Sequence, residues 1–365
     1  MDFGGLQGKF DVFAKKNRLE RHLSVNEEFR EDCEDSYIHS LLAKFGWEGP
    51  YKNHFNRWCK MNEFNVLRDW IRYVKWDGTD HIDRLYQTLD LPDDGNDYKT
   101  LLKRWLLQCC SVWTSDIGGK AEMVLVLYGS QGIGKTTWVK NLLPQHPMYV
   151  EDGFVLDGSS KDSQLIAIQH ALVEFGEIGR TTKGIDFLKA FLSKPFDTLR
   201  LPYAERANTY HRRTCFAGTV DRVNYLRDDA GNRRFFTLPV GNGMNAFHNV
   251  NMQQCFAQCY ALLMQGERGW LNQVELGMLT SINRQYIPQT TLEAMLLENF
   301  DPTGKSFKWM TPAEILPAIG RDRDIAVFNP QVLRNLLSKE RWFDKKAGSR
   351  GTLYHLPEQK ERFYS

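Results

Sequence analysis

The segment that most constrains how this chain can fold is glycine-rich. Residues 129–136 read Gly-Ser-Gln-Gly-Ile-Gly-Lys-Thr and match the pattern G-x-x-x-x-G-K-[ST]. An unbroken apolar run at 123–128 precedes them, as expected for a strand buried on both faces of a parallel sheet. A plausible helix at 137–143, closed by Pro144, follows them. This strand–loop–helix order predicts a phosphate-binding loop rather than a chance glycine-rich turn.

Each residue type in this segment suits the binding of a nucleoside triphosphate. The glycines let backbone N–H groups turn toward phosphate oxygens. Lys135 is long enough to reach the β- and γ-phosphates, and the Thr136 hydroxyl is placed to ligate Mg²⁺. We therefore expect ATP and Mg²⁺ as cofactors. The predicted nucleotide-binding residues are Gly129, Ser130, Gln131, Gly132, Ile133, Gly134, Lys135, Thr136 and Thr137.

The rest of the chain is typical of an α/β protein. Further strand-like runs occur at 171–175, 214–219 and 234–238, with helical stretches between them. Because strands alternate with helices, we predict an α/β fold with a parallel sheet, and the loop indicates an AAA+-like P-loop ATPase core. Helical periodicity at 36–75, at 98–114 and from about 246 predicts helical regions on both sides of that core.

These patterns predict four segments. They are a helical N-terminal region at 1–115, the P-loop ATPase core at 116–245, a helical lid or connector at 246–300, and a winged-helix-like module at 301–365. In the last segment, Thr311-Pro312 and Asn329-Pro330 are typical helix starts, with a capping residue followed by proline. Residues 342–356 are typical of a β-hairpin with a basic, glycine-containing tip.

Composition narrows the class of protein. A hydrophobic content of 42% and a charged content of 25% are ordinary for a globular protein. No apolar stretch approaches the length of a membrane span, and the N-terminus lacks the layout of a secretory signal. Seven cysteines without regular spacing argue against a disulfide framework. Cys255 and Cys259 resemble a zinc half-site, but they lie in a helical pattern without a second pair, which favours core cysteines.

Acidic residues follow the loop at a second apolar run. A P-loop ATPase needs a carboxylate at a strand end to hold Mg²⁺ and to orient water, and residues 171–177 supply Glu174 and Glu177. We favour Glu177 as the base and Glu174 as its acidic neighbour and Mg²⁺ ligand, although the roles can be exchanged or both side chains can be solvated. After the third run, Thr219 and Asp221 are candidates for a group that senses hydrolysis, with Asp221 equally well explained as a turn residue.

Paired arginines enter the last strand-like run of the core. Arg233 and Arg234 can form surface ion pairs, or one of them can act as an arginine finger in the site of a neighbouring subunit. Arginine suits that role because its planar guanidinium binds phosphate bidentately and stays charged.

A basic segment with interleaved aromatic residues lies at 200–213, between the second and third strand-like runs. Basic side chains can follow phosphates while aromatic rings stack on bases, and a hairpin inserted here would project toward the central channel of a ring. The alternative is a solvated basic face. The predicted DNA-binding residues, including those of the C-terminal hairpin, are Arg200, Tyr203, Arg206, Tyr210, Arg212, Arg213, Lys345, Lys346 and Arg350.

These motifs together resemble a known family. Trp76-Asp77-Gly78, the glycine-rich loop, and the segments at 174–178, 197–203 and 231–235 occur in the order seen in virulence-associated protein E, a family of phage and mobile-element ATPases similar to superfamily 3 helicases. The resemblance covers roughly residues 65–245. Relatives usually have asparagine where this chain has Asp221, which as an acceptor can still bind water.

The resemblance implies a function and partners. It implies a ring-shaped homo-oligomer, commonly a hexamer, that uses ATP to translocate on single-stranded DNA during replication of a phage or genomic island. A separate primase and duplex origin DNA are further expected partners, and the cytoplasm of the bacterial host is the expected location. Two alternatives remain open: a DNA-binding replication initiator whose ATPase is an assembly switch, and a small-molecule kinase.

Overall fold

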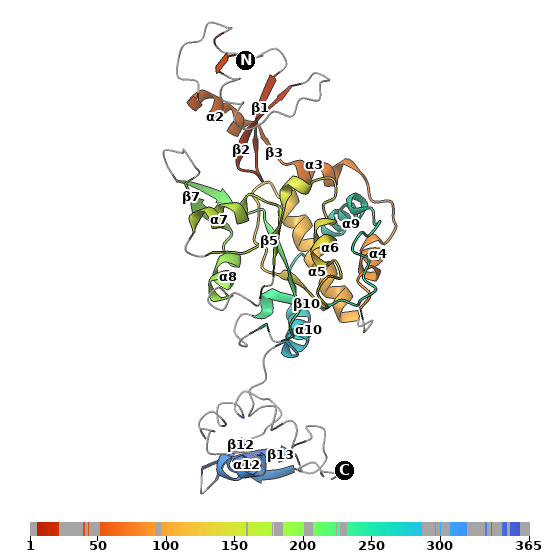
Figure 1. The fold of residues 1–365 in the computed structure, drawn as a ribbon, viewed down its shortest axis with the longest axis vertical. Helices are drawn as coiled ribbons and strands as arrows, with labels where there is room; N and C mark the ends of the chain where they lie inside the picture. The colour runs from red at the N-terminus through yellow and green to blue at the C-terminus, as the bar shows by residue number, and fades with distance from the viewer. Residues whose placement is uncertain are drawn as a thin grey trace. The chain divides into compact units, whose positions relative to one another are not determined.

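The computed structural model divides the chain into two compact units, residues 1–287 and 288–365. It describes residues 6–21, 39–40, 43, 52–91, 96–157, 160–176, 178, 185–200, 207–223, 225–226, 232–286, 296, 300, 307–319, 333, 337, 345–348 and 351–357. Helices from the predicted N-terminal region and connector lie in the same unit as the sheet of the predicted core (Figure 1).

A five-stranded parallel sheet forms the centre of the first unit. Its order is β10-β4-β9-β6-β5, and each neighbouring pair is parallel. Four strands, β4 (Val124–Tyr128), β6 (Leu172–Phe175), β9 (Cys215–Val220) and β10 (Phe235–Pro239), confirm the runs expected from the sequence. The α/β class with a parallel sheet is therefore confirmed.

The fifth strand, β5 (Val150–Phe154), was not predicted, because its sequence VEDGF is neither continuously apolar nor alternating. It lies at the edge of the sheet, where charged side chains remain in solvent. Its pairing with β6 shifts register between Glu151 and Phe154, where Gly153 adopts a φ of 63°. That irregularity matters below, because Gly153 contacts the candidate site.

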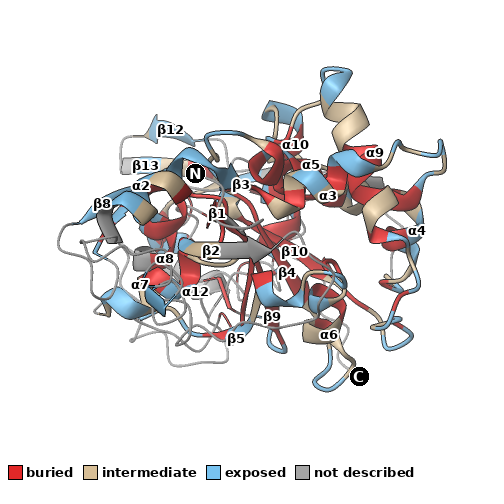
Figure 2. Ribbon diagram, turned by 90° about the horizontal axis from the view of Figure 1, so that it is seen from above, coloured by how far each residue is buried: buried red, intermediate tan, exposed pale blue. Residues whose placement is uncertain are grey.

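Helices pack beside the sheet, and the residues of β4, β6, β9 and β10 are almost all buried, whereas those of the edge strand β5 are mostly not (Figure 2). The helix α5 (Asn96–Thr114) packs on β4 and β9, and α9 (Met252–Met264) packs on α5. The remaining helices of the sheet region are α3 (Val66–Tyr73), α4 (His81–Gln87), α6 (Lys135–Lys140), α7 (Lys161–Ile168), α8 (Ile185–Leu192) and α10 (Gln273–Arg284). The helical character predicted at 98–114 and after 246 is confirmed.

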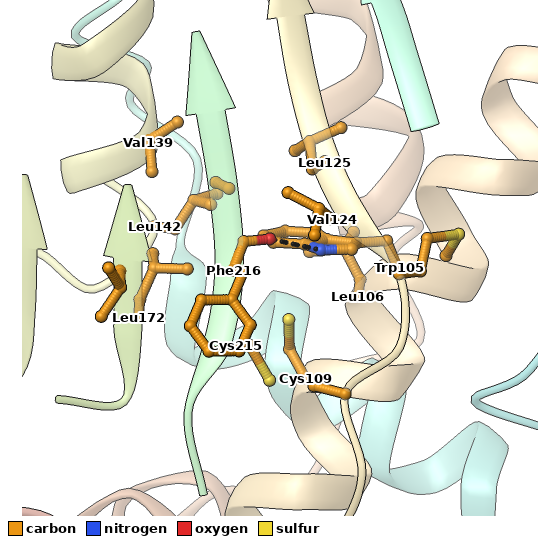
Figure 3. Packing of buried hydrophobic residues seen from close by; sticks show 14 of the residues in the cluster. Trp105, Leu106, Cys109, Val124, Leu125, Val139, Leu142, Leu172, Cys215 and Phe216 are labelled. Atoms are coloured by element: carbon orange, nitrogen blue, oxygen red, sulfur yellow. Dashed lines mark hydrogen bonds between the residues drawn. The ribbon is translucent and has the colours of Figure 1, made fainter. Parts of the chain in front are cut away.

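Packing between α5 and β9 illustrates how the core is built. The Trp105 indole Nε1 donates to the backbone oxygen of Phe216 at 3.1 Å, and the Cys109 thiol meets that of Cys215 (Figure 3). The Phe216 ring stacks on that of Phe175 with centroids 5.5 Å apart. All of these side chains are at most 4% exposed. Burying one large apolar side chain contributes about 1.5–3 kcal/mol, so this contact fixes the strand that carries part of the candidate site.

The N-terminal region is helical in part of the range 36–75, where the sequence predicts helical character. Among the described residues it contains a hairpin of β1 (Leu6–Asp11) and β2 (Lys16–Arg21), then α2 (Lys52–Met61), β3 (Glu63–Phe64) and α3. The sheet order is β2-β1-β3, with β3 parallel to β1. The helical pattern breaks at Asn65, whose side chain accepts from Arg68 N at 2.9 Å as the N-cap of α3.

The second unit, taken by itself, contains the antiparallel sheet β11-β13-β12, formed by β11 (Phe307–Met310), β12 (Lys345–Gly348) and β13 (Gly351–Pro357). The helix α12 (Pro312–Ile319) begins at the proline expected from the sequence, and the Glu314 carboxylate accepts from Thr311 N at 2.7 Å. The C-terminal hairpin is confirmed. Most of the second predicted helix lies outside the described residues; two of its members, Leu333 and Leu337, are described, and both are helical.

Candidate nucleotide site and nucleic-acid interface

The glycine-rich loop connects β4 to α6, as the motif predicts. Gly129 N donates to Val220 O at 3.3 Å, which joins the start of the loop to the end of β9. Gly132 and Gly134 have φ values of 83° and 92°, which L side chains rarely adopt. Gly134 is the N-cap of α6, and Lys135 is the first helical residue. The loop therefore needs glycine at these two positions to reach the helix.

Lys135 lies across the loop. Its Nζ donates to the backbone oxygens of Gly129 and Ser130, each at 2.8 Å, and the residue is 8% exposed. Burial lowers the pKa of the Lys135 ammonium, while Asp221 and Glu174 act in the opposite direction. The cation is thus held at the loop by carbonyl oxygens, with two carboxylates near enough to stabilise its charge.

Glu174 is fully buried near the end of β6. Its Oε1 accepts from the Thr219 hydroxyl and its Oε2 from Gly153 N, both at 2.8 Å. Burial raises the pKa of the Glu174 carboxyl, partly offset by these two hydrogen bonds and by Lys135. Both oxygens of the Glu174 carboxyl are therefore fixed in orientation by hydrogen bonds from neighbouring strands.

Parallel strands bring these residues together at one edge of the sheet. The register pairs Thr219 of β9 with Leu127 of β4, two residues before the first glycine of the loop. Thr219 is 7% exposed, whereas Asp221, one residue beyond β9, is exposed. Ligands of open α/β sheets bind outside the carboxyl ends of the strands. The structure thus gathers Lys135, Glu174, Thr219 and Asp221 at the edge where a ligand is expected.

A segment that the sequence analysis did not single out also contacts the loop. Residues 240–246 follow β10, and a Cβ placed on Gly134 would come within 2.5 Å of the Ala246 Cβ. The Asn141 amide, just after α6, donates to Ala246 O at 2.9 Å. Gly243 N donates to the Asp90 carboxylate at 2.7 Å. The sequence Gly-Asn-Gly at 241–243 predicts a loop, but it does not indicate which part of the protein the loop packs against.

The Trp76-Asp77-Gly78 motif has a structural role in this fold. The Asp77 carboxylate accepts from Thr79 N at 2.8 Å and lies 3.1 Å from His81 Nε2, and Asp77 N donates to the Gln254 side chain on α9 at 3.0 Å. These contacts fix the turn between α3 and α4 against α9, rather than placing the motif in the candidate site.

The two arginines of the last motif have different environments. Both lie in a 3-10 turn, η3 (Asn232–Arg234), directly before β10. Arg234 is half-buried, and its Nη2 donates to the Ser193 hydroxyl at 2.7 Å. Arg233 is exposed. Within the described part of the chain, neither guanidinium forms a hydrogen bond or ion pair with the glycine-rich loop.

The basic segment includes a hairpin, as predicted, inserted between β6 and β9. Its strands are β7 (Phe196–Leu199) and β8 (Asn208–His211), which pair antiparallel. Arg200 is exposed at the end of β7. Tyr203 and Arg206, like Glu177 and Arg350, lie outside the described residues, so their roles stay predictions. Lys345 and Lys346 are exposed on β12 of the second unit.

Three members of the predicted DNA-binding set are buried at the base of this hairpin. Arg212 is 1% exposed, and its guanidinium donates to the Asp197 carboxylate at 2.6 and 3.0 Å. Arg213 is 6% exposed and donates to Asp116 O, and Tyr210 is 9% exposed. The assignment of these side chains to direct DNA contact is therefore corrected, because they bind within the chain. The sequence alone did not show which of the four arginines in this segment are buried.

The cysteines confirm the prediction made for Cys255 and Cys259, both of which are fully buried on α9. Burial raises the pKa of the Cys259 thiol. Within the described residues no group of three or more His, Cys, Asp or Glu side chains has the arrangement of a metal site. In the same part of the chain, no helix combines the length and apolarity needed to cross a membrane.

Comparison with known proteins gives one family. The virulence-associated protein E-like domain matches residues 71–288. A search of curated proteins gives no match. Among solved structures, the apo C-terminal region of NrS-1 aligns with a TM-score of 0.50 and 12% identity over 98% of this chain and 96% of that one. The A form of that region gives 0.49 and 11% over 97% and 96%.

The NrS-1 likeness indicates a similar fold. The family match covers more than half of the chain, including the glycine-rich loop, the Glu174 strand and the arginine pair. The chain belongs to the virulence-associated protein E-like domain family.

Proposed function

We propose that this protein is an ATP-hydrolysing DNA motor of the superfamily 3 helicase type, with an AAA+-like core, acting in replication of a phage or mobile element. The observation that carries the proposal is the grouping of Lys135, Glu174, Thr219 and Asp221 beside a glycine-rich loop. A lysine at the loop and a carboxylate beside it are among the groups that P-loop enzymes use for phosphoryl transfer to water, and the Thr219 hydroxyl holds that carboxylate in place.

The residues present fit a bound nucleotide. Phosphate oxygens would replace the two loop carbonyls as acceptors for Lys135 Nζ, so little rearrangement is needed. Thr136, in the first turn of α6, and Glu174 would hold Mg²⁺, which when bound neutralises charge on the β- and γ-phosphates. The pKa of Glu174 is raised by burial, and a cation beside it would favour the ionised form.

The remaining residues complete a hydrolytic mechanism. A carboxylate, Glu177 in our preferred assignment or Glu174, would accept a proton from the attacking water as the bond to the terminal phosphorus forms and ADP leaves. Thr219 would keep the Glu174 carboxylate oriented through the 2.8 Å hydrogen bond. Arg233 is the better candidate for a finger in a neighbouring subunit, because it is exposed whereas Arg234 is bound to Ser193.

The proposed DNA contacts are the tip of the β7–β8 hairpin and the second unit. Arg200 is exposed where β7 ends, and the tip that follows carries Tyr203 and Arg206. Basic and aromatic side chains in a segment that connects two paired strands suit single-stranded DNA. In the second unit, which we propose to be a winged-helix-like module, the Lys346 ammonium lies 4.0 Å from the centre of the Trp309 ring, and Lys345 is exposed beside it. These groups suit duplex phosphates.

The test of this function measures two activities on the same preparation. We expect ATP hydrolysis that single-stranded DNA stimulates and ATP-dependent strand displacement on a forked duplex. We also expect a ring oligomer, which electron microscopy with nucleotide present would show. Hydrolysis and DNA binding without displacement would favour the second candidate, an initiator whose ATPase is an assembly switch. Hydrolysis that DNA does not stimulate would exclude both the motor and the initiator and would favour a small-molecule kinase.

A further inference from the structure

The turn of the N-terminal hairpin is buried within the first unit although it connects two short strands. Asp11 is fully buried and Phe13 is 1% exposed. The Asp11 carboxylate accepts from Tyr149 OH at 2.8 Å and lies 2.9 Å from the Arg18 guanidinium. Gln169, after α7, donates to Ala14 O at 3.2 Å. The turn, residues 11–16, is therefore held by the region around β5 and α7.

Lys15 extends this contact to the β7–β8 hairpin. It is 4% exposed and has a φ of 56°, a left-handed conformation that costs free energy for a residue with a side chain. Its Nζ donates to Val12 O at 2.5 Å and to His211 O at 3.4 Å, and it lies 6.0 Å from the centre of the Tyr210 ring. Tyr210 and His211 both belong to β8, so one ammonium contacts the turn and the hairpin.

The surroundings of Lys15 contain charges from several elements. Burial lowers the pKa of the Lys15 ammonium to about 7, and Arg213, just before β9, acts in the same direction. Asp11 of the turn, Glu63 of β3 and Asp197 of β7 oppose this change. The charge of Lys15 therefore depends on pH near neutrality, and its protonated form repels the Arg213 guanidinium.

The base of the hairpin is connected to the candidate nucleotide site by a short stretch of chain. Arg212 N donates to Pro195 O at 3.0 Å, and Gly119 N donates to Arg212 O at 2.9 Å. Residues 212–214 then lead directly into β9, which carries Thr219. A group that contacts β8 at His211 thus acts at the point where the hairpin joins the site strand.

We infer that the turn at 11–16 positions the β7–β8 hairpin, and that Lys15 is the positioning residue through which the N-terminal segment acts on it. The inference depends on the proposed function only for the effect that it predicts on DNA binding. If the hairpin contacts single-stranded DNA, Lys15 controls how firmly that contact surface is held. Lys15 does not itself touch nucleotide or DNA.

The test compares Lys15→Met, which keeps most of the side-chain length without the charge, with Lys16→Met, an exposed neighbour of the same turn. Backbone amide exchange in the full chain, without ligand, reports on the hairpin independently of function. We expect exchange at 208–211 to be about threefold faster or more in Lys15→Met and unchanged in Lys16→Met. In the DNA assay, Lys15→Met should raise the half-saturating concentration of single-stranded DNA about threefold with little change in basal turnover.

A pH series on the wild-type protein keeps the inference testable if Lys15→Met does not fold. After correction for intrinsic exchange, protection at 208–211 should rise from about pH 6 to about pH 8.5, because burial and the Arg213 guanidinium both disfavour the protonated form of Lys15, and the neutral amine, unlike methionine, can still donate to His211 O. Protection in β4 should change less. Flat protection at 208–211, or equal exchange in both variants, would overturn the inference. Wild-type protein without ATPase or DNA binding would instead refute the proposed function, and the exchange result would stand separately.

Discussion

The Thr219 hydroxyl donates to the Glu174 carboxylate at 2.8 Å, and this hydrogen bond joins the strand beside the glycine-rich loop to the strand that carries the acid. Both residues are buried. The pair explains how a carboxylate can be kept in one orientation at the carboxyl edge of the sheet. It also makes Glu174 a residue whose protonation is linked to folding.

Replacing Glu174 with glutamine should abolish turnover without lowering stability at neutral pH. Burial raises the folded-state pKa of Glu174 above that of the unfolded chain, so its stabilising contribution is present at low pH and is lost as pH rises through the folded pKa. The free energy of unfolding of Glu174→Gln, relative to wild type, should therefore increase as the pH rises above about 4, the ordinary range of a glutamate carboxyl. Denaturant unfolding at several pH values measures this, and parallel profiles would contradict it.

Substitution of Arg233 should affect turnover, whereas substitution of Arg234 should affect stability. Arg233→Ala should leave nucleotide binding intact and lower turnover about a thousandfold, because the exposed guanidinium is proposed to act in a neighbouring site. Arg234→Ala should mainly destabilise the fold, because it removes the hydrogen bond to Ser193. Nucleotide affinity, turnover and unfolding measured on both variants separate the effects. Loss of binding in Arg233→Ala would argue against action in trans.

Two glycines of the loop form a matched pair. Gly132 and Gly134 both have positive φ, so alanine at either should cost about 1–2 kcal/mol of backbone strain. An added Cβ at Gly134 would also meet the Ala246 Cβ at 2.5 Å, whereas at Gly132 no described residue other than the chain neighbours comes within 4 Å of an added Cβ. Gly134→Ala should therefore weaken ATP binding more than Gly132→Ala. Equal nucleotide affinities in a titration would show that the contact with Ala246 is unimportant.

Arg212 should prove to be a structural residue. Arg212→Met leaves the Asp197 carboxylate buried without its cation, which should cost about 3–5 kcal/mol of stability. In the double variant with Asp197→Leu most of that loss should be recovered. Arg200→Ala, at an exposed position, should instead weaken binding of single-stranded DNA with little change in unfolding. If Arg212→Met instead weakened DNA binding without lowering stability, Arg212 would have to be counted again among the DNA-contacting residues.

The sequence predicted those parts of the fold whose pattern is local. Continuous apolar runs identified β4, β6, β9 and β10, and the Thr-Pro start identified α12. The edge strand β5 was missed because its exposed acidic residues and glycine resemble a loop. The helical character predicted at 36–75 was correct for α2 and α3 but wrong for the residues between them, since helical spacing alone does not reveal the Asn65 cap and the short β3 pairing.

The candidate site was predictable in its residue types and less so in its contacts. Lys135 and Glu174 follow from the motif and from an acid at the end of a buried strand. Their partners depend on which strands are neighbours, so the bonds of Glu174 to Gly153 and Thr219 could not be derived from spacing. Burial of Arg212 is likewise a tertiary property, because it requires Asp197 across the hairpin.

The most direct test of the account is ATP hydrolysis by wild type, Lys135→Ala and Lys140→Ala prepared in parallel. Lys140 is the matched control, because it lies in the same helix but its ammonium is exposed and paired with Asp152 at 3.1 Å. The account predicts turnover that single-stranded DNA stimulates in wild type and in Lys140→Ala, and a loss of about a hundredfold or more in Lys135→Ala. Turnover in Lys135→Ala equal to that of wild type would contradict the assignment of the nucleotide site.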